Sequence, residues 1–66
     1  MRIQVNGDEV EIQGASNVAE LMEKYQMPPQ SVLIEHNGKA LHPREWRQRI
    51  LENGDRIEIV RVVAGG

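Results

Sequence analysis

Residues 2–12 read Arg2-Ile3-Gln4-Val5-Asn6-Gly7-Asp8-Glu9-Val10-Glu11-Ile12, with apolar and polar residues alternating on both sides of a central turn signal. A period of two is typical of a strand with one buried face. The Asn-Gly pair tolerates the positive φ angles of a tight turn. The segment therefore predicts a β-hairpin with strands at 2–5 and 9–12. Its apolar face, which another part of the chain must cover, carries Ile3, Val5, Val10 and Ile12.

The following segment has the pattern of a covering helix. Asn17 is a favourable N-cap, and Glu20 three residues later completes a variant of the capping box. Pro28-Pro29 cannot continue a helix. We therefore predict a helix over about 17–26 that packs across the hairpin. Its apolar face has the spacing of successive helical turns and carries Val18, Leu21, Met22 and Tyr25.

The second half of the chain predicts further strands. Residues 32–36 form an apolar run, which favours a strand with both faces partly buried, and 39–41 continue past the Asn37-Gly38 turn as a short partner. A turn at 53–55 precedes a last strand at 56–63, rich in Ile and Val. Such a strand suits the middle of a sheet, and we expect it to pair in parallel with the first strand.

Between these strands lies a short helical element. Pro43 is favoured at the first position of a helix, so we predict about one turn over 44–48. Trp46 is expected to point inward and close the core, and Ile50 and Leu51 are expected to return to the core. The complete pattern predicts an α+β fold, in which a mixed sheet of four to five strands packs on one main helix.

Composition limits the possible functions. The chain has 66 residues, 39% of them hydrophobic, a formal net charge of −2 and no cysteine. One domain of this size buries little core, which favours a binding module, a carrier or a subunit over an enzyme. The lack of cysteine excludes disulfides, thiolate zinc sites and a cysteine nucleophile. The slight acidity argues against nucleic acid, and the absence of long apolar runs argues against a membrane span and a signal peptide. We therefore expect a cytoplasmic protein.

The chain ends in Ala64-Gly65-Gly66, which serves no purpose in the predicted fold. One interpretation is a frayed terminus. The other is that the carboxylate of Gly66 is a reactive group at the end of a flexible arm. Glycine has no Cβ, so Gly65 and Gly66 could enter a narrow channel in another protein.

A few other residues are candidates for partner contact. Val60 and Val62 are expected on the sheet face opposite the helix, as a docking patch or simply as good strand formers. Arg61 could pair with an acidic partner surface. His36 and His42 are expected to be solvated rather than metal ligands, because no suitable cluster accompanies them.

Several segments together form a specific pattern along the chain: Asn6-Gly7, Val18-Ala19-Glu20-Leu21-Met22, Glu35-His36-Asn37-Gly38, Pro43-Arg44-Glu45-Trp46, residues 51–59 and Val63-Ala64-Gly65-Gly66. In this order they resemble the sulfur carrier proteins of thiamin biosynthesis along essentially the whole length of the chain. The sequence departs from the pattern of that family at Asn17, where Thr is more frequent, at Met22, where Leu is more frequent, and at Trp46, which lies one place closer to the preceding Pro-Arg.

The resemblance implies a ubiquitin-like β-grasp domain over 1–63, a tail over 64–66, and a carrier that is not itself an enzyme. An E1-like enzyme would adenylate the carboxylate of Gly66 with ATP and Mg²⁺, so the carrier itself binds no cofactor. A cysteine-desulfurase system would supply sulfur, and thiazole synthase would receive it from the thiocarboxylate. The free carrier is expected to be a monomer. The alternatives are the small subunit of molybdopterin synthase, a ubiquitin-like modifier, and an interaction module with an inert tail.

Overall fold

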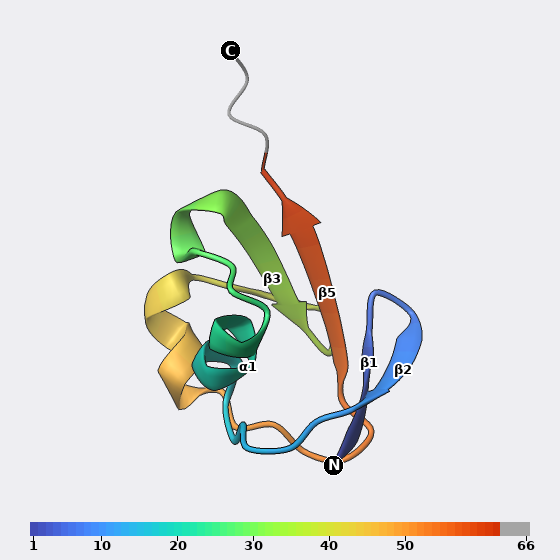
Figure 1. Ribbon diagram of the computed structural model, residues 1–66. Helices are drawn as coiled ribbons and strands as arrows, with labels where there is room; N and C mark the ends of the chain where they lie inside the picture. Colours follow the sequence, from blue (N-terminus) through green and yellow to red (C-terminus); the bar gives the residue numbers. More distant parts are fainter. Residues whose placement is uncertain (63–66) are drawn as a thin grey trace.

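A computed structural model describes residues 1–62 of the protein. A five-stranded sheet in the order β2-β1-β5-β3-β4 packs against one helix (Figure 1). This is the mixed sheet and single main helix expected from the sequence. The elements in chain order are β1 (Arg2–Val5), β2 (Asp8–Glu11), α1 (Val18–Lys24), the 3₁₀ helix η1 (Pro29–Ser31), β3 (Val32–His36), β4 (Lys39–Leu41), the 3₁₀ helix η2 (Pro43–Gln48) and β5 (Arg56–Arg61).

The last strand, β5, lies in the middle of the sheet and pairs with the first strand, β1, as predicted. Asn6 and Gly7 both have positive φ angles, 51° and 85°, which is the geometry of a tight hairpin turn. Strand β5 pairs in parallel with β1 and antiparallel with β3. The side chain of Asn6 extends the parallel pairing, because its Oδ1 accepts from the N–H of Ile59 at 2.7 Å and its Nδ2 donates to the carbonyl of Ile59 at 3.2 Å.

Helix α1 begins as predicted and ends earlier. The Asn17 side chain accepts from the N–H of Glu20 at 2.8 Å. The Glu20 carboxylate accepts from the N–H and hydroxyl of Ser16, one residue earlier than a capping box requires, and these bonds lower the pKa of Glu20. The helix ends at Lys24, with Tyr25 as its C-cap, because Gln26 takes the left-handed φ of 57°.

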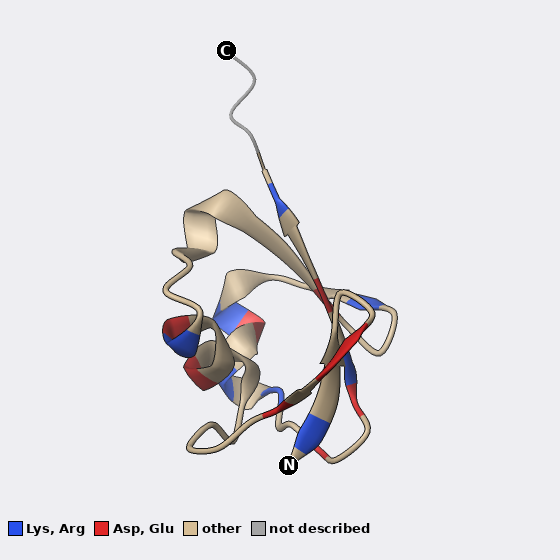
Figure 2. Cartoon of the chain, turned by 45° about the vertical axis from the view of Figure 1, so that its right-hand side comes forward, with Lys and Arg blue, Asp and Glu red and all other residues tan. Residues whose placement is uncertain are grey.

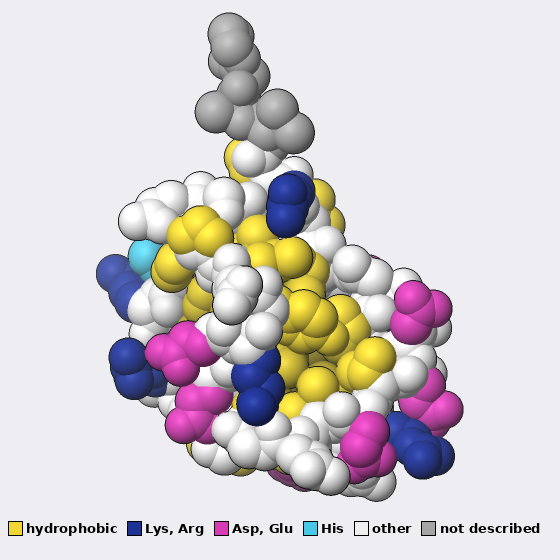
Figure 3. Space-filling model, viewed as in Figure 1, with side chains coloured by type: hydrophobic (Ala, Val, Ile, Leu, Met, Phe, Trp, Pro, Cys, Tyr) yellow, Lys and Arg dark blue, Asp and Glu magenta, His cyan; other side chains and the backbone are white. Residues whose placement is uncertain are grey.

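The core lies between the helix and one face of the sheet. Trp46 belongs to it as predicted, with 4% of its surface exposed. Partly buried hydrophobic side chains surround this core, and Figure 3 shows hydrophobic side chains in the middle of one face with charged groups around them. The buried residues are Ile3, Val5, Ile12, Ala15, Val18, Leu21, Met22, Val32, Ile34, Leu41, Trp46, Leu51 and Ile57.

Two expectations about the burial of hydrophobic residues were wrong. Ile50 is 59% exposed, whereas Leu51 is buried. Ile50 forms an isolated antiparallel bridge with Asn17, and neighbouring residues of an extended segment point in opposite directions. In β3 the burial alternates strictly, so Leu33 is 60% exposed between the buried Val32 and Ile34. Strand β3 is thus buried on one face only.

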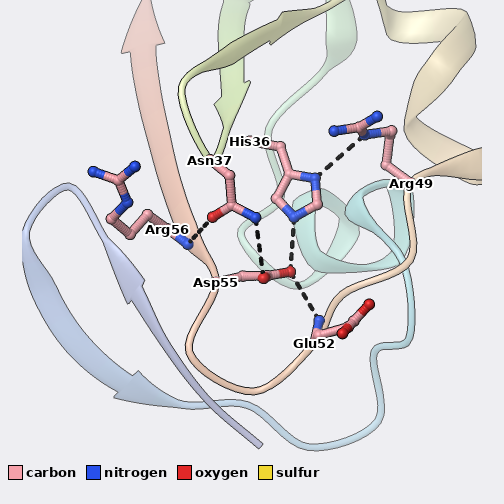
Figure 4. A network of polar contacts seen from close by, with 6 residues as sticks. All are labelled: His36, Asn37, Arg49, Glu52, Asp55 and Arg56. Atoms are coloured by element: carbon pink, nitrogen blue, oxygen red, sulfur yellow. Dashed lines mark hydrogen bonds and ion pairs between the residues drawn. The ribbon is translucent and has the colours of Figure 1, made fainter.

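His36 was predicted to be solvated, and the structure contradicts this. It is 6% exposed and belongs to a polar network that joins β3 to the loop before β5 (Figure 4). Its Nδ1 accepts from Nε of Arg49 at 3.3 Å, which fits the tautomer whose Nε2 donates to Oδ2 of Asp55 at 2.7 Å. Asp55 also accepts from Nδ2 of Asn37 and from the N–H of Glu52.

The network affects the charge state of Asp55. Burial of this carboxyl opposes ionisation, yet the hydrogen bonds from His36, Glu52 and Asn37 together lower the pKa of Asp55 below its ordinary value. The ionised carboxylate therefore stabilises the folded state at neutral pH. This contribution is present above the pKa of the unfolded state and is lost as the pH falls through the folded-state pKa.

We expect Asp55→Asn to lower the free energy of unfolding by about 1–3 kcal/mol at pH 7, because an amide replaces a charged acceptor of three hydrogen bonds. Urea titrations at several pH values would measure the difference. It should shrink as the pH falls below about 4, the ordinary pKa of an aspartate, and vanish once the pH has fallen through the lower pKa of the folded state. Asp8→Asn, at an exposed position of the hairpin, is the control. A difference independent of pH would contradict the electrostatic explanation.

Candidate functional site

The candidate site is the end of strand β5, where the chain approaches its C-terminus. The strand points away from the end of the molecule that holds the N-terminus (Figure 1). Val62, the last residue described, donates its N–H to the carbonyl of Ser31 at 2.8 Å, so the exit of the chain from the sheet is held by η1. The predicted tail residues Ala64, Gly65 and Gly66 lie outside the described residues.

An exposed apolar patch borders this exit. Val60 and Val62 are 53% and 47% exposed, as expected from the sequence. Ile57, which is buried, and Ile59, which is partly buried, occupy the core side of β5, so Val60 lies on the outer face of the sheet, opposite α1. Val62 follows two residues later, just beyond the end of the strand. Leu33 of β3 stands directly opposite Val60 in the antiparallel register. We call these three residues the Leu33–Val60–Val62 patch.

Sequence reasoning missed Leu33, although a signal for it was present. The run Val32-Leu33-Ile34 hides the alternation of the strand, but the polar Glu35 two residues after Leu33 indicates which face is solvated. The adjacency of Leu33 and Val60 could not be inferred, because it depends on the register between strands far apart in the sequence.

Arg61 lies beside this patch and not within it. It is exposed and opposite Val32 in the register with β3. Side chains alternate between the two faces along β5, and Arg61 falls on the same face as Ile57 and Ile59. The Arg61 side chain therefore projects from the face of the sheet that carries the core. The predicted contact residues thus divide between the two sides of the strand end.

The structure also has a pocket away from the end of β5. A cavity of about 290 Å³ lies between α1 and η2, with Met22, Trp46 and Arg44 in its wall. Within residues 1–62, no three His, Asp or Glu side chains cluster as a metal site would require. In the same range no helix is long and apolar enough to cross a membrane. What the described residues offer is an exposed apolar surface beside the end of strand β5.

Comparison with known proteins gives a consistent result. The chain has 29% sequence identity to the thiamine biosynthesis protein (ThiS) from Geobacter metallireducens. The crystal structure of that protein superposes with a TM-score of 0.83 over 100% of both chains. An NMR structure of a thiamine biosynthesis protein from the same organism gives a TM-score of 0.80, 29% identity, and coverage of 100% of this chain and 88% of the other. An uncharacterised protein, ycf40, from Trieres chinensis is 27% identical over 62 residues, which are 94% of this chain and 85% of the relative.

The family model extends the match through the C-terminal residues. The model of the ThiS family aligns with residues 3–66, which include the two terminal glycines. The sheet order and the single helix agree with the ubiquitin-like β-grasp fold of the ThiS structure. On this evidence the chain belongs to the ThiS family.

Proposed function

We propose that the protein is a sulfur carrier of thiamin biosynthesis, and that the carboxylate of Gly66 is the group that carries sulfur. The observation that carries this proposal is the family match over residues 3–66, which includes the Gly65-Gly66 terminus. The structure supports it by placing an exposed apolar surface beside the strand end from which that terminus continues. A protein that must present its C-terminus to an enzyme needs a surface of this kind close by.

The proposed chemistry follows from the properties of a carboxylate. An α-carboxyl has a pKa of about 3.5, so it is ionised at neutral pH and is a poor electrophile. An E1-like enzyme would therefore let one carboxylate oxygen attack the α-phosphate of ATP, with release of pyrophosphate. The acyl-adenylate then has a good leaving group, and the persulfide of a cysteine-desulfurase-type donor displaces AMP to form an acyl disulfide. A thiol then reduces the S–S bond, forms a disulfide with the donor and releases the thiocarboxylate. The resulting thiocarboxylate is a nucleophile that thiazole synthase can use.

The amino-acid sequence also indicates which steps of this chemistry the partner enzymes would perform. Its sequence has no Gly-rich loop followed by Lys and Ser or Thr to hold a nucleotide, and no cysteine to hold sulfur. ATP and Mg²⁺ would accordingly bind to the adenylating partner. We propose that the protein is a co-substrate rather than an enzyme, acting as a cytoplasmic monomer between its encounters.

Removal of Gly66 tests the carrier chemistry. We expect intact-mass spectrometry, after incubation with ATP, Mg²⁺, the adenylating enzyme and a sulfur donor, to show exchange of one oxygen for sulfur in the full chain. The chain lacking Gly66 should show no exchange, because its carboxylate is withdrawn by about 3.5 Å. Omission of the sulfur donor should stop the full chain at the adenylate. Exchange that persists without Gly66 would show that the carboxylate of this residue is not the carrier group.

The Leu33–Val60–Val62 patch makes a second prediction. We expect Leu33→Asp and Val60→Asp each to weaken binding to the adenylating enzyme by about tenfold or more, because a charge replaces an apolar contact. Isothermal titration would measure the affinities, and circular dichroism would confirm that both variants fold. Ile50→Asp is the matched control, because Ile50 is similarly exposed and lies outside the sheet. If all three variants bind like the wild type, the patch is not the docking surface.

A further inference from the structure

Two glutamates face each other on the outer face of the sheet, next to the Leu33–Val60–Val62 patch. Glu35 of β3 and Glu58 of β5 are partners in the antiparallel register, one step along the same face from the Leu33–Val60 pair. Both are exposed. The outer face therefore changes, along β3 and β5, from apolar near the exit of the chain to acidic behind it.

The acidic pair forms no ion pair within residues 1–62, because neither Glu35 nor Glu58 takes part in any of the ion pairs of this part of the chain. On β4 the residue opposite Glu35 is Ala40, which carries no charge. Arg56 follows on the same face of β5, and its guanidinium forms no ion pair with either carboxylate. Figure 2 shows the acidic and basic segments that succeed one another along the strand.

The Glu35–Glu58 pair does not favour the stability of the folded protein by itself. Like charges directly opposite each other on neighbouring strands destabilise a sheet, and uncharged polar or β-branched side chains would serve these exposed positions better. Two carboxylates also fall short of the ligand number that Ca²⁺ requires, and among residues 1–62 no third acidic or histidine side chain joins them. The chemistry that suits two adjacent carboxylates beside an apolar patch is a guanidinium or ammonium group of a protein partner.

We propose that the Glu35–Glu58 pair binds a basic side chain of the adenylating enzyme, next to the apolar contact made by the patch. This inference rests on the proposed function and specifies the partner surface: an apolar area with an arginine or lysine at its border. The two contacts lie in sequence along β3 and β5. Together they would fix the orientation in which the carrier docks, with its C-terminus directed into the adenylation site of the enzyme and not away from it.

The decisive variant is Glu58→Lys, because folding and binding should respond in opposite directions. A lysine opposite Glu35 turns a repulsive cross-strand pair into an attractive one, so the melting temperature should rise by a few degrees. Binding to the adenylating enzyme should become at least roughly tenfold weaker, because like charges now meet at the interface. A purely structural role for Glu58 would not produce this combination.

Variants with uncharged side chains at positions 35 and 58, and the dependence of binding on salt concentration, complete the test. The double variant Glu35→Gln/Glu58→Gln should bind roughly fivefold more weakly than the wild type at low salt, and its affinity should depend less on ionic strength. Glu9→Lys is the matched control, because Glu9 lies opposite Gln4 on the outer face, two strands away from β5, and changes the net charge by the same amount as Glu58→Lys.

The outcomes separate this inference from the proposed function. If the wild type binds and is adenylated, and Glu58→Lys and the double variant bind equally well, the acidic pair does not contact the partner. Equal losses in Glu9→Lys and Glu58→Lys would reduce the effect to net charge and overturn the specific contact. A wild-type chain that is neither bound nor adenylated would overturn the proposed function and the contact together. Loss of binding confined to the Glu35 and Glu58 variants would support the proposal.

Discussion

The central position of β5 is the constraint on which the rest of the structure depends. This strand joins the first hairpin to β3, pairing in parallel with Val5 through Ile57 and antiparallel along most of its length with β3. The side chain of Asn6 continues the parallel contact to Ile59. Both edges of β5 are hydrogen-bonded to neighbouring strands. The chain leaves the sheet beyond the end of β5, at Val62. The fold therefore sets the point, at Val62, where the described chain leaves the sheet.

The two faces of β5 differ in their packing and in their polarity. Ile57 is buried against the helix side and contributes to a core that is small because the domain is small. On the other face, Val60 lies exposed and Glu58 faces Glu35, and like charges directly opposite each other do not favour a sheet. A sheet covered by a single helix has one face free of packing requirements. Residues suited to binding can occupy that face without disturbing the core.

The opposite end of the sheet is held by polar contacts. His36 is buried where a hydrophobic side chain would be the simpler choice, and its bond to Asp55 fastens the loop that leads into β5. Asn37 reinforces the same junction, because its Oδ1 accepts from the N–H of Arg56 and its Nδ2 donates to Asp55. These bonds start β5 in a defined register against β3. That register in turn places Leu33 opposite Val60.

The sequence by itself determined what depends on neighbours along the chain. The alternation around Asn6-Gly7 predicted the hairpin, the helical spacing after Asn17 predicted α1, and the pattern of the last strand predicted the exposure of Val60 and Val62. The resemblance to a known family identified Gly66 as the candidate carrier group. Only the tertiary structure decided the burial of His36, the exposure of Leu33, and the meeting of Glu35 with Glu58. These features depend on strand register and on contacts between distant segments, which local periodicity does not contain.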